Sequence, residues 1–406
     1  MNSFKNKRKK QFMIYKIKTY LDCILIRFVF ILLIFFLGFS CNNERNENKS
    51  EDQHQQLINI DRIPKSNSDS ITITDLKYVF LESTPKGIIG KIDKIKIYNN
   101  KYYLLDINIT NRLYLFEDNG KFIKTIGRKG KGPGEYIQLM DFDIDKYGNV
   151  YLYDNGKKNL IVFDNYGKLI REIKLKSRFF EFALIDQETL AVYNCFNKGK
   201  VIAHIGKYNL NSEDLQIIIP GRKVKDDLSI VKFSSKYLYD TDSGILCNPR
   251  FSNNILRIKK TKTSKIIEIS DEYIPNENIV LKLKQDRNYG ILNDKYILDI
   301  RNIYETNKFF NLTIYKRLFK NIIISKNTSN LKVFTGMENN NYLGNNEFIG
   351  CYNNYFISLI EPKMIEKQAW RAKLNRSTLD EKIKTKLNNL DITSNPVLIF
   401  IKFQTF

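Results

Sequence analysis

The chain has 406 residues and a formal net charge of +22; 43% of its residues are hydrophobic and 13% are aromatic. This is the composition of a globular protein, and it excludes an intrinsically disordered chain. Excess positive charge suits anionic partners such as nucleic acid, lipid head groups or acidic glycans. Because the mature part has no dense run of Lys and Arg and no nucleic-acid motif, we expect no nucleic-acid partner and interpret the charge mainly as a solvated surface.

Residues 1–40 have the layout of a signal peptide. Positive residues precede an uninterrupted apolar run, Phe28–Phe39, which is shorter than the roughly twenty residues of a transmembrane helix. The run is followed by Ser40 and Cys41, a sequence that resembles the lipobox of bacterial lipoproteins, with Phe39 where a small residue is usual. The resemblance implies that Cys41 is acylated and becomes the new N-terminus. A plain signal peptide and an uncleaved anchor are the alternatives.

Residues 41–70 are predicted to be a flexible polar tether. Asn42–Gln56 is polar and charged and has no apolar periodicity. We expect one folded domain at residues 71–406, held in the cell envelope by the lipid anchor, with the outer membrane as the favoured membrane. Whether the domain faces the periplasm or the outside is open.

An internal repeat predicts the fold. Asp106 and Gly120 in one unit correspond to Asp154 and Gly167 in the next, which gives a period of about 47 residues. Ile123–Ile173 reads as four short antiparallel strands separated by turns, which is the layout of a propeller blade. We therefore predict an all-β fold, a six-bladed β-propeller with four-stranded antiparallel blades. Six blades are favoured over seven because the later units carry insertions.

The C-terminal part changes character. Residues 364–390 are charged and have helical propensity, which predicts a short helical insert with a capping box at Ser377, Asp380 and Glu381. Trp370 is expected to pack this insert onto a blade. The strand that begins at Asn395 is expected to close the ring by pairing with the N-terminal strands.

Two motifs carry a family resemblance. The stretches IGRKGKGPGEY at 126–136 and DFDIDKYGNVYLYD at 141–154 resemble the NHL-repeat family of six-bladed β-propellers. More narrowly, the chain from 71 to 406 resembles the six-bladed propeller lipoproteins of Bacteroidetes, in which endings like Leu81-Glu82-Ser83 and strands like Asn395-Pro396-Val397-Leu398 recur. That family has no generally assigned activity. The resemblance therefore implies the fold and an envelope location, and no catalytic residues.

The Gly-rich loop is a candidate ligand site. Backbone amides of such a loop can hold an anion. The loop lacks the strand–loop–helix context and the Lys-Ser or Lys-Thr ending of a nucleotide-binding loop, so a structural link between blades is the favoured interpretation. Its residues are Gly127, Arg128, Lys129, Gly130, Lys131, Gly132 and Gly134.

Acidic residues give two further candidates. Asp106 and Asp154 recur at the ends of second strands, where we favour the bracing of a turn over a place in the central channel. The alternating residues Asp141, Asp143 and Asp145 resemble a calcium-binding loop, but the Gly and Glu that such a loop needs are absent. We predict no cofactor and keep calcium there as a minor alternative.

Histidine and cysteine are sparse. His54 lies in the tether and His204 in a strand, so neither a metalloenzyme nor a His-based triad is expected. We expect Cys195, Cys247 and Cys351 to be buried free thiols, with one disulfide among them as the alternative.

The sequence contains no catalytic constellation. We favour a binding or scaffold module that uses one propeller face, with an envelope protein, glycan or peptide as its ligand. The alternative is a hydrolase or lyase centred on the channel, and a signalling accessory with a basic face is a third reading. Several carboxylates or a metal in the channel favour the enzyme, and an apolar or neutral channel favours the binder.

Overall fold

The computed structural model describes residues 57–63, 71–197, 200–221, 236–249, 251–276, 278–280, 282, 295–316, 318–334, 341–345 and 347–406. The chain divides into two units, Met1–Gln56 and Leu57–Phe406. The predicted signal peptide, Cys41 and His54 lie outside the described residues.

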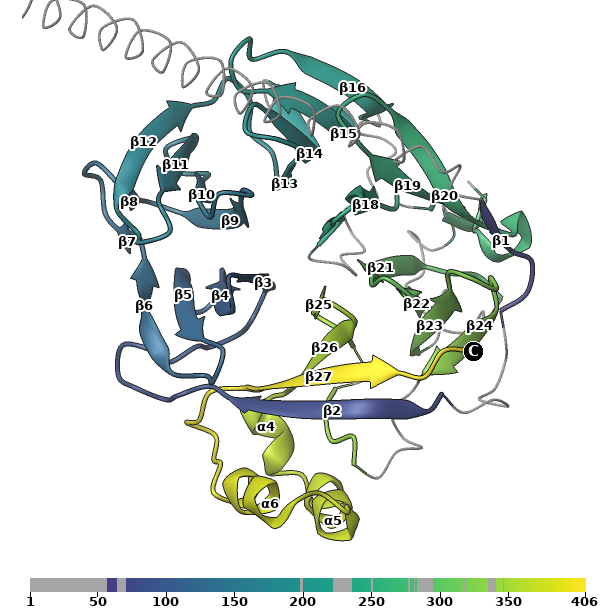
Figure 1. Cartoon of the computed structure of the whole chain (residues 1–406). Coiled ribbons are helices and arrows are strands. Elements are labelled where there is room, and N and C mark those ends of the chain that lie inside the picture. The colour runs from purple at the N-terminus through teal and green to yellow at the C-terminus, as the bar shows by residue number, and fades with distance from the viewer. Residues whose placement is uncertain are drawn as a thin grey trace, which may run out of the picture. The chain divides into compact units, whose positions relative to one another are not determined.

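Six antiparallel sheets surround a common centre, and we number them as blades in chain order (Figure 1). Blade 1 consists of β3 (Lys94–Tyr98), β4 (Lys101–Asp106), β5 (Arg112–Glu117) and β6 (Phe122–Ile126). Blade 2 consists of β9 (Leu139–Ile144), β10 (Val150–Asp154), β11 (Asn159–Phe163) and β12 (Leu169–Lys174). Blade 3 consists of β13 (Glu181–Leu184), β14 (Thr189–Asn197), β15 (Lys200–Asn209) and β16 (Leu215–Pro220).

The other three blades repeat this order. Blade 4 consists of β17 (Leu238–Thr241), β18 (Gly244–Cys247), β19 (Asn254–Ile258) and β20 (Thr263–Ile269). Blade 5 consists of β21 (Asp299–Glu305), β22 (Phe309–Tyr315), β23 (Phe319–Ser325) and β24 (Leu331–Phe334). Blade 6 consists of β25 (Gly350–Tyr352), β26 (Tyr355–Ile360), β27 (Val397–Phe403) and β2 (Ile73–Phe80). The prediction of a six-bladed propeller is confirmed.

Blade 6 is built from both ends of the domain. The C-terminal strand β27 lies between β26 and the N-terminal strand β2 and pairs antiparallel with both. The predicted closure is confirmed, and it removes the open sheet edges that a linear array would leave. Asn395, just before β27, donates its side-chain amide to the carbonyl oxygens of Glu82 (2.8 Å) and Gly87 (2.7 Å). Its backbone amide donates to Ser83 Oγ at 2.8 Å, so the two signature segments of the resemblance bind each other directly.

Tight turns between the strands depend on residues that tolerate a left-handed backbone. Gly120 has a φ of +89° in the turn between β5 and β6. A Cβ atom there would lie 2.1 Å from the carbonyl oxygen of Phe80 on β2. Only glycine therefore lets this turn of blade 1 approach blade 6 so closely.

Short elements extend the propeller. β1 (Ile58–Ile60) adds to blade 4 by parallel pairing with β20, and β7 (Arg128–Lys129) pairs with β8 (Glu135–Tyr136) in the link between blades 1 and 2. β1 lies inside the range for which the sequence predicted a tether. Ile58 and Ile60 are 5% and 2% exposed, and burying these two side chains stabilises the strand. The strand was not predicted because three residues are too few to show an alternating pattern.

Three short helices separate β26 from β27: α4 (Pro362–Ile365), α5 (Gln368–Arg376) and α6 (Glu381–Asn388). A 3₁₀ turn, η2, covers Asp271–Tyr273. Trp370 is buried and donates its indole N–H to the carbonyl oxygen of Leu343 at 2.9 Å, so it packs the insert as predicted. The predicted capping box is wrong in part: Asp380 is the N-cap of α6 and accepts from the Lys382 amide, whereas the Ser377 hydroxyl donates to Leu374 at the end of α5.

The cysteines in the described part of the chain carry free thiols. Cys195, Cys247 and Cys351 are free; the first two are buried and the third is half-buried. The expectation of free thiols is therefore confirmed, and the structure has no disulfide among these three residues.

Within the described part of the chain, no helix combines the length and the apolar character that crossing a bilayer requires.

Candidate functional site

The first strands of the blades lie nearest the centre of the ring (Figure 1). Several of them carry charged residues. Lys94 on β3 forms a 2.7 Å ion pair with Asp141 on β9. Lys96, two residues on, is paired with both Asp143 on β9 and Asp240 on β17. The lysines and aspartates neutralise each other, so the centre of the ring between blades 1, 2 and 4 is a network of ion pairs.

The carboxylates of this network also bind the backbone of the next blade. Asp141 and Asp143 accept hydrogen bonds from the backbone amides of Phe182 (2.9 Å) and Leu184 (2.6 Å) on β13. Glu181 on β13 repeats the pattern, because it accepts from the amides of Tyr237 and Leu238 at the start of β17. Side-chain contacts therefore link four consecutive blades around the centre.

Burial shifts the protonation of several of these groups. Burial, together with the charge of Asp141, raises the pKa of Glu181 to about 7. Burial, together with the charge of Lys94, lowers the pKa of Lys236 to about 8. For Lys94 burial opposes protonation, but the carboxylates of Asp141 and Asp143 outweigh it and raise its pKa. The charge on the ring centre therefore changes near neutral pH.

Asp141, Asp143 and Asp145, at which calcium was the minor alternative, lie on β9 and in the turn that follows it. Asp141 and Asp143 are occupied by lysines and amides, as described above. Asp145 accepts from the backbone amides of Tyr147 and Asn149, both at 2.9 Å, and so braces the turn between β9 and β10. Among the described residues no group of His, Cys, Asp and Glu is arranged to hold a metal ion.

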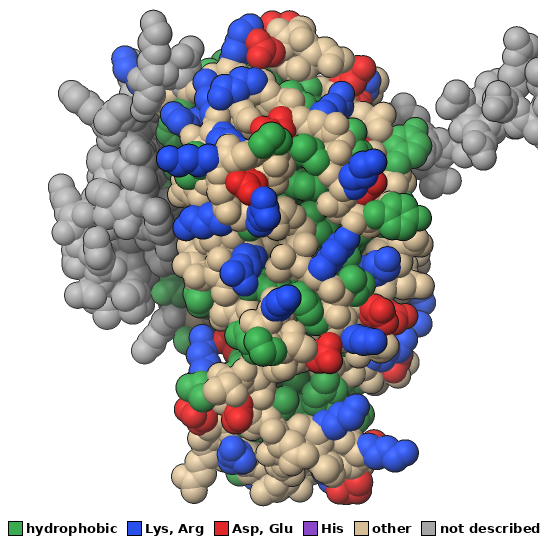
Figure 2. Space-filling model, turned by 90° about the vertical axis from the view of Figure 1, so that its left-hand side faces the viewer, with side chains coloured by type: hydrophobic (Ala, Val, Ile, Leu, Met, Phe, Trp, Pro, Cys, Tyr) green, Lys and Arg blue, Asp and Glu red, His purple; other side chains and the backbone are tan. Residues whose placement is uncertain are grey.

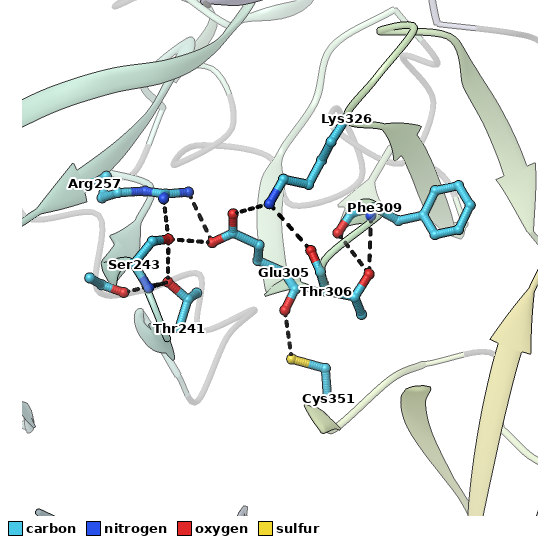
Figure 3. A network of polar contacts seen from close by, with 9 residues as sticks. Thr241, Ser243, Arg257, Glu305, Thr306, Phe309, Lys326 and Cys351 are labelled. Atoms are coloured by element: carbon cyan, nitrogen blue, oxygen red, sulfur yellow. Dashed lines mark hydrogen bonds and ion pairs between the residues drawn. The ribbon is translucent and has the colours of Figure 1, made fainter. Parts of the chain in front are cut away.

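A second polar network joins blades 4, 5 and 6 (Figure 3). The side chain of Glu305, at the end of β21, is 6% exposed and accepts from Arg257 (2.9 Å) and Lys326 (2.7 Å). Burial opposes ionisation of Glu305, but the two cations outweigh it and lower its pKa. Cys351 donates its thiol to the backbone oxygen of Glu305 at 3.2 Å, and burial raises the pKa of this thiol to about 12. The thiol is therefore protonated at neutral pH, and the network joins blades without supplying a nucleophile.

Asp106 and Asp154 occupy equivalent positions and brace equivalent turns. Both side chains are fully buried at the ends of β4 and β10. Asp106 accepts from the backbone amides of Gly90, Lys91 and Ile109 at 2.9, 3.2 and 3.0 Å. Each carboxylate fixes a turn within its own blade and the link that enters that blade.

For Asp154 the three donors are the backbone amides of Ile137, Gln138 and Gly156, each at 2.9 Å. Both residues therefore have the turn-bracing geometry that the sequence favoured over a place in the channel.

These braced segments lie at one end of the ring, which we call the loop face. It carries the links between blades and the turns between the second and third strands of each blade, because antiparallel strands bring these connections to the same end. Large apolar side chains are exposed there: Ile88 (39%), Ile109 (64%), Ile137 (41%) and Phe180 (51%). These four belong to the entries and turns of blades 1, 2 and 3, and Leu318, 70% exposed, lies in the corresponding turn of blade 5.

Hydrogen bonds tie these positions into one continuous arc. Asn111, in the turn that holds Ile109, donates its side-chain amide to the backbone oxygen of Leu139 at 2.7 Å. The Tyr136 hydroxyl donates to the backbone oxygen of Asn111 at 2.9 Å. The turn of blade 1 is therefore attached to the link that carries Ile137. Beyond it, Asn155 of blade 2 accepts from Arg178 at 3.4 Å, two residues before Phe180.

The Gly-rich loop lies in the same link and binds carboxylates of the chain itself. Gly132 N–H donates to Glu135 Oε2 at 2.8 Å, and Gly134 N–H donates to Glu172 Oε1 at 2.7 Å. Arg128 Nε donates to Glu135 Oε1 at 2.6 Å. An external anion would have to displace these carboxylates, so we do not propose that the backbone amides of this loop hold an anion.

Sequence reasoning missed Lys94, Lys96 and Asp240, although the repeat contained a signal for the lysines. Lys94 and Asp141 are 47 residues apart, and so are Lys96 and Asp143. Aligning the first strands of the two repeats would have placed each lysine opposite an aspartate on the neighbouring blade. Asp240 gave no such signal, because its blade is too degenerate to align.

Comparisons with known proteins agree with this architecture. The family model of a domain of unknown function, DUF4934, matches residues 56–402. The structure of a Bacteroides fragilis NCTC 9343 protein inferred to be exported is similar, with a TM-score of 0.70, 19% sequence identity, and coverage of 86% of this chain and 100% of that chain. Among curated proteins, none matches this chain.

Two less similar structures were also found. A member of the DUF4221 family from Bacteroides vulgatus ATCC 8482 has a TM-score of 0.47 and 11% identity, covering 82% of this chain and 98% of that chain. Virginiamycin B lyase from Staphylococcus aureus has a TM-score of 0.37 and 10% identity, covering 81% and 99%. The fold of this chain is a six-bladed β-propeller. Since the DUF4934 model spans most of the chain, the protein belongs to the DUF4934 family.

Proposed function

We propose that the protein is a lipid-anchored module of the cell envelope that binds a partner through its loop face. One observation carries the proposal. The exposed side chains of Ile109 and Ile137 stand on backbone amides that the buried carboxylates of Asp106 and Asp154 hold in place. Apolar side chains that are exposed on a preorganised backbone lose little conformational entropy on binding, and this favours association.

The ring centre carries several carboxylates, the feature that favours channel chemistry, and the pKa of one of them, Glu181, is raised to about 7. Glu181 accepts from two backbone amides at the start of blade 4, which supports a structural role for it over proton exchange with a substrate. A hydrolase or lyase would need carboxylates that can exchange protons with a substrate. Asp141 and Asp143 are instead held by Lys94, Lys96 and the amides of blade 3. These contacts make the centre a rigid hub that fixes the blades, and with them the loop face.

The location rests on the N-terminal segment. The apolar run Phe28–Phe39, with Cys41 two residues after it, supports export and acylation, and the similar Bacteroides fragilis protein is itself inferred to be exported. Replacing Cys41→Ala is expected to abolish fatty-acid labelling and to move the protein from the membrane to the soluble fraction. Unchanged labelling and membrane partition in this variant would disprove the anchor.

Binding through the loop face can be tested by footprinting. Hydroxyl-radical labelling would be compared between the purified protein and the protein in isolated native envelopes. We expect protection of Ile109, Ile137 and Phe180 in envelopes. Tyr147 and Tyr166, which are 58% and 78% exposed in turns at the opposite end of blade 2, serve as controls and should label equally in both samples. Equal labelling of the loop face in both samples would overturn the proposal.

A further inference from the structure

We propose that the partner of the loop face is the anionic surface of a phospholipid bilayer. This inference rests on the proposed function, because it names the chemical class of what that face binds. It goes beyond the lipid anchor, since it assigns a second membrane contact to the propeller itself. Blades 1 and 2 combine exposed apolar side chains with unpaired cations, and this combination carries the inference.

The apolar part consists of separate side chains on turns and links. Ile109 is 64% exposed in the turn between β4 and β5. Ile137 and Phe180 are 41% and 51% exposed just before β9 and β13. Side chains of this kind can enter the boundary between head groups and acyl chains, whereas water around them is unfavourable.

Cations accompany these side chains. Arg112 begins β5, three residues after Ile109, and Lys129 and Lys131 lie in the Gly-rich loop of the link that carries Ile137. All three cations are exposed, and none forms an ion pair with another described residue. Figure 2 shows Lys and Arg spread over the adjoining side of the molecule, where β6, β7 and β12 lie, with fewer Asp and Glu.

The carboxylates of this region are already bound by groups of the chain itself. Glu135 binds Arg128 and the Gly132 amide, and Glu172 binds the Gly134 amide. The free charge beside the apolar arc is therefore positive. Cations that flank insertable apolar side chains complement anionic lipid head groups, and each cation adds to the attraction.

A bilayer suits this surface better than a folded partner does. Ile109, Ile137 and Phe180 come from three different blades and stand on separate segments. A flat, deformable surface can meet all of them at once, and unpaired cations at its rim need only the diffuse negative potential of the head groups. An acidic protein segment is the other occupant that the test separates.

The experiment uses the chain from residue 42 onward, because all six blades and their cores lie within Leu57–Phe406. Co-sedimentation would be measured with vesicles of phosphatidylethanolamine and phosphatidylglycerol, and with vesicles of phosphatidylcholine alone. We expect binding to the anionic vesicles that weakens as salt is added. Absent binding, or equal binding to both vesicle types, would overturn the inference.

Two pairs of variants locate the contact. Lys129→Glu with Lys131→Glu should weaken binding to the anionic vesicles by about tenfold or more, since two attractive charges become repulsive. Ile109→Ser with Ile137→Ser should also weaken it. Lys146→Glu with Lys168→Glu makes the same charge change in exposed turns at the opposite end of blade 2 and should leave most of the binding intact. If this control pair loses as much as the loop-face pair, the inference is wrong.

The outcomes for the two proposals are distinguishable. If the vesicles are not bound but the footprint in native envelopes protects Ile109 and Ile137, the bilayer is excluded and a protein or glycan partner remains under the proposed function. If neither experiment shows an effect, both proposals fail.

Discussion

Lys96 of blade 1 and Asp240 of blade 4 form an ion pair across the centre of the ring. Two blades separate them on either side of the circle, so this contact joins opposite blades. The same ammonium group also binds Asp143 of blade 2. One side chain therefore ties three of the six blades together, at the point where a propeller has no backbone pairing between sheets.

The substitution Lys96→Met should destabilise the domain strongly. The substitution leaves the buried carboxylate of Asp143, whose side chain is 1% exposed, without its cation. Removing one partner of a buried pair costs about 3 to 5 kcal/mol in the free energy of unfolding. Urea denaturation measures the change.

Asp240→Asn should cost less, because the Asp240 side chain is 27% exposed and Lys96 keeps Asp143 as a partner. Lys265→Met, which breaks an exposed pair with Glu268, is the matched control and should change stability by less than about 1 kcal/mol. Equal effects of Lys96→Met and Lys265→Met would contradict the role of the central pair.

Asp106→Ala and Asp154→Ala should have similar costs, since each carboxylate accepts three backbone amides in an equivalent place. Leaving buried amides without acceptors should cost about 2 to 4 kcal/mol per variant. Thermal unfolding and urea denaturation measure it. Asp118→Ala, in an exposed turn of blade 1, is the control. A cost for either brace no larger than that of the control would show that the brace is dispensable.

Asn395→Ala should disrupt the closure of the ring. The buried Asn395 side chain donates to Glu82 and Gly87 and accepts from the Ile89 amide, and no other side chain replaces these bonds in the variant. We expect a loss of about 2 to 4 kcal/mol and early exchange of the amides of β27 and β2, measured by hydrogen exchange. Asn389→Ala, at the exposed end of α6, is the control. Unchanged exchange in β27 would contradict the proposed role of Asn395.

Stability should depend on pH through Glu181. Its pKa is raised to about 7, so the folded state keeps a proton that the unfolded chain releases near the ordinary value of 4.5. The folded state therefore binds more protons in this window, and the stability it gains from them falls as the pH rises from about 4.5 to 7. Glu181→Gln should flatten the pH profile over this window, measured by urea denaturation at a series of pH values. Exposed Glu188→Gln should leave the profile unchanged, and an equally steep profile in Glu181→Gln would contradict the assignment.

The contribution of Lys236 to stability changes in the opposite direction, at higher pH. Its pKa is lowered to about 8, so the folded state loses a proton that the unfolded chain keeps up to its ordinary value of 10.5. Its contribution to stability rises between these values, and together the two groups predict a minimum near pH 7 to 8.

The repeat explains why the fold was predictable. Blades 1 and 2 have similar turns and strands of five or six residues each. A chain built from such units buries its edges by closing on itself, which Asn395 and β27 confirm. The tether was predicted to extend to residue 70, which is too far along the chain. The strand at Ile58–Ile60 has only three residues, too few to give a recognisable pattern in the sequence. Ser377 was misplaced because the helical propensity of residues 364–390 does not show where one helix ends and the next begins.

The site was less predictable, because it depends on distance through space. Asp106 and Asp154 were found because they recur in the repeat. Nothing in the sequence shows that Asp240 reaches Lys96 across the ring. Nor does it show that Ile109 and Ile137 are exposed, since isolated isoleucines in a β protein are usually core.

The most direct test of the loop-face account is site-specific photo-crosslinking in living cells. A photoreactive residue would replace Ile109 or Ile137 on the loop face, or Tyr147 or Tyr166 at the opposite end, and adducts would be identified by mass spectrometry as protein, glycan or lipid. We predict adducts from positions 109 and 137 and a much lower yield from 147 and 166. Adducts mainly from the opposite end, or none from the loop face, would contradict the account.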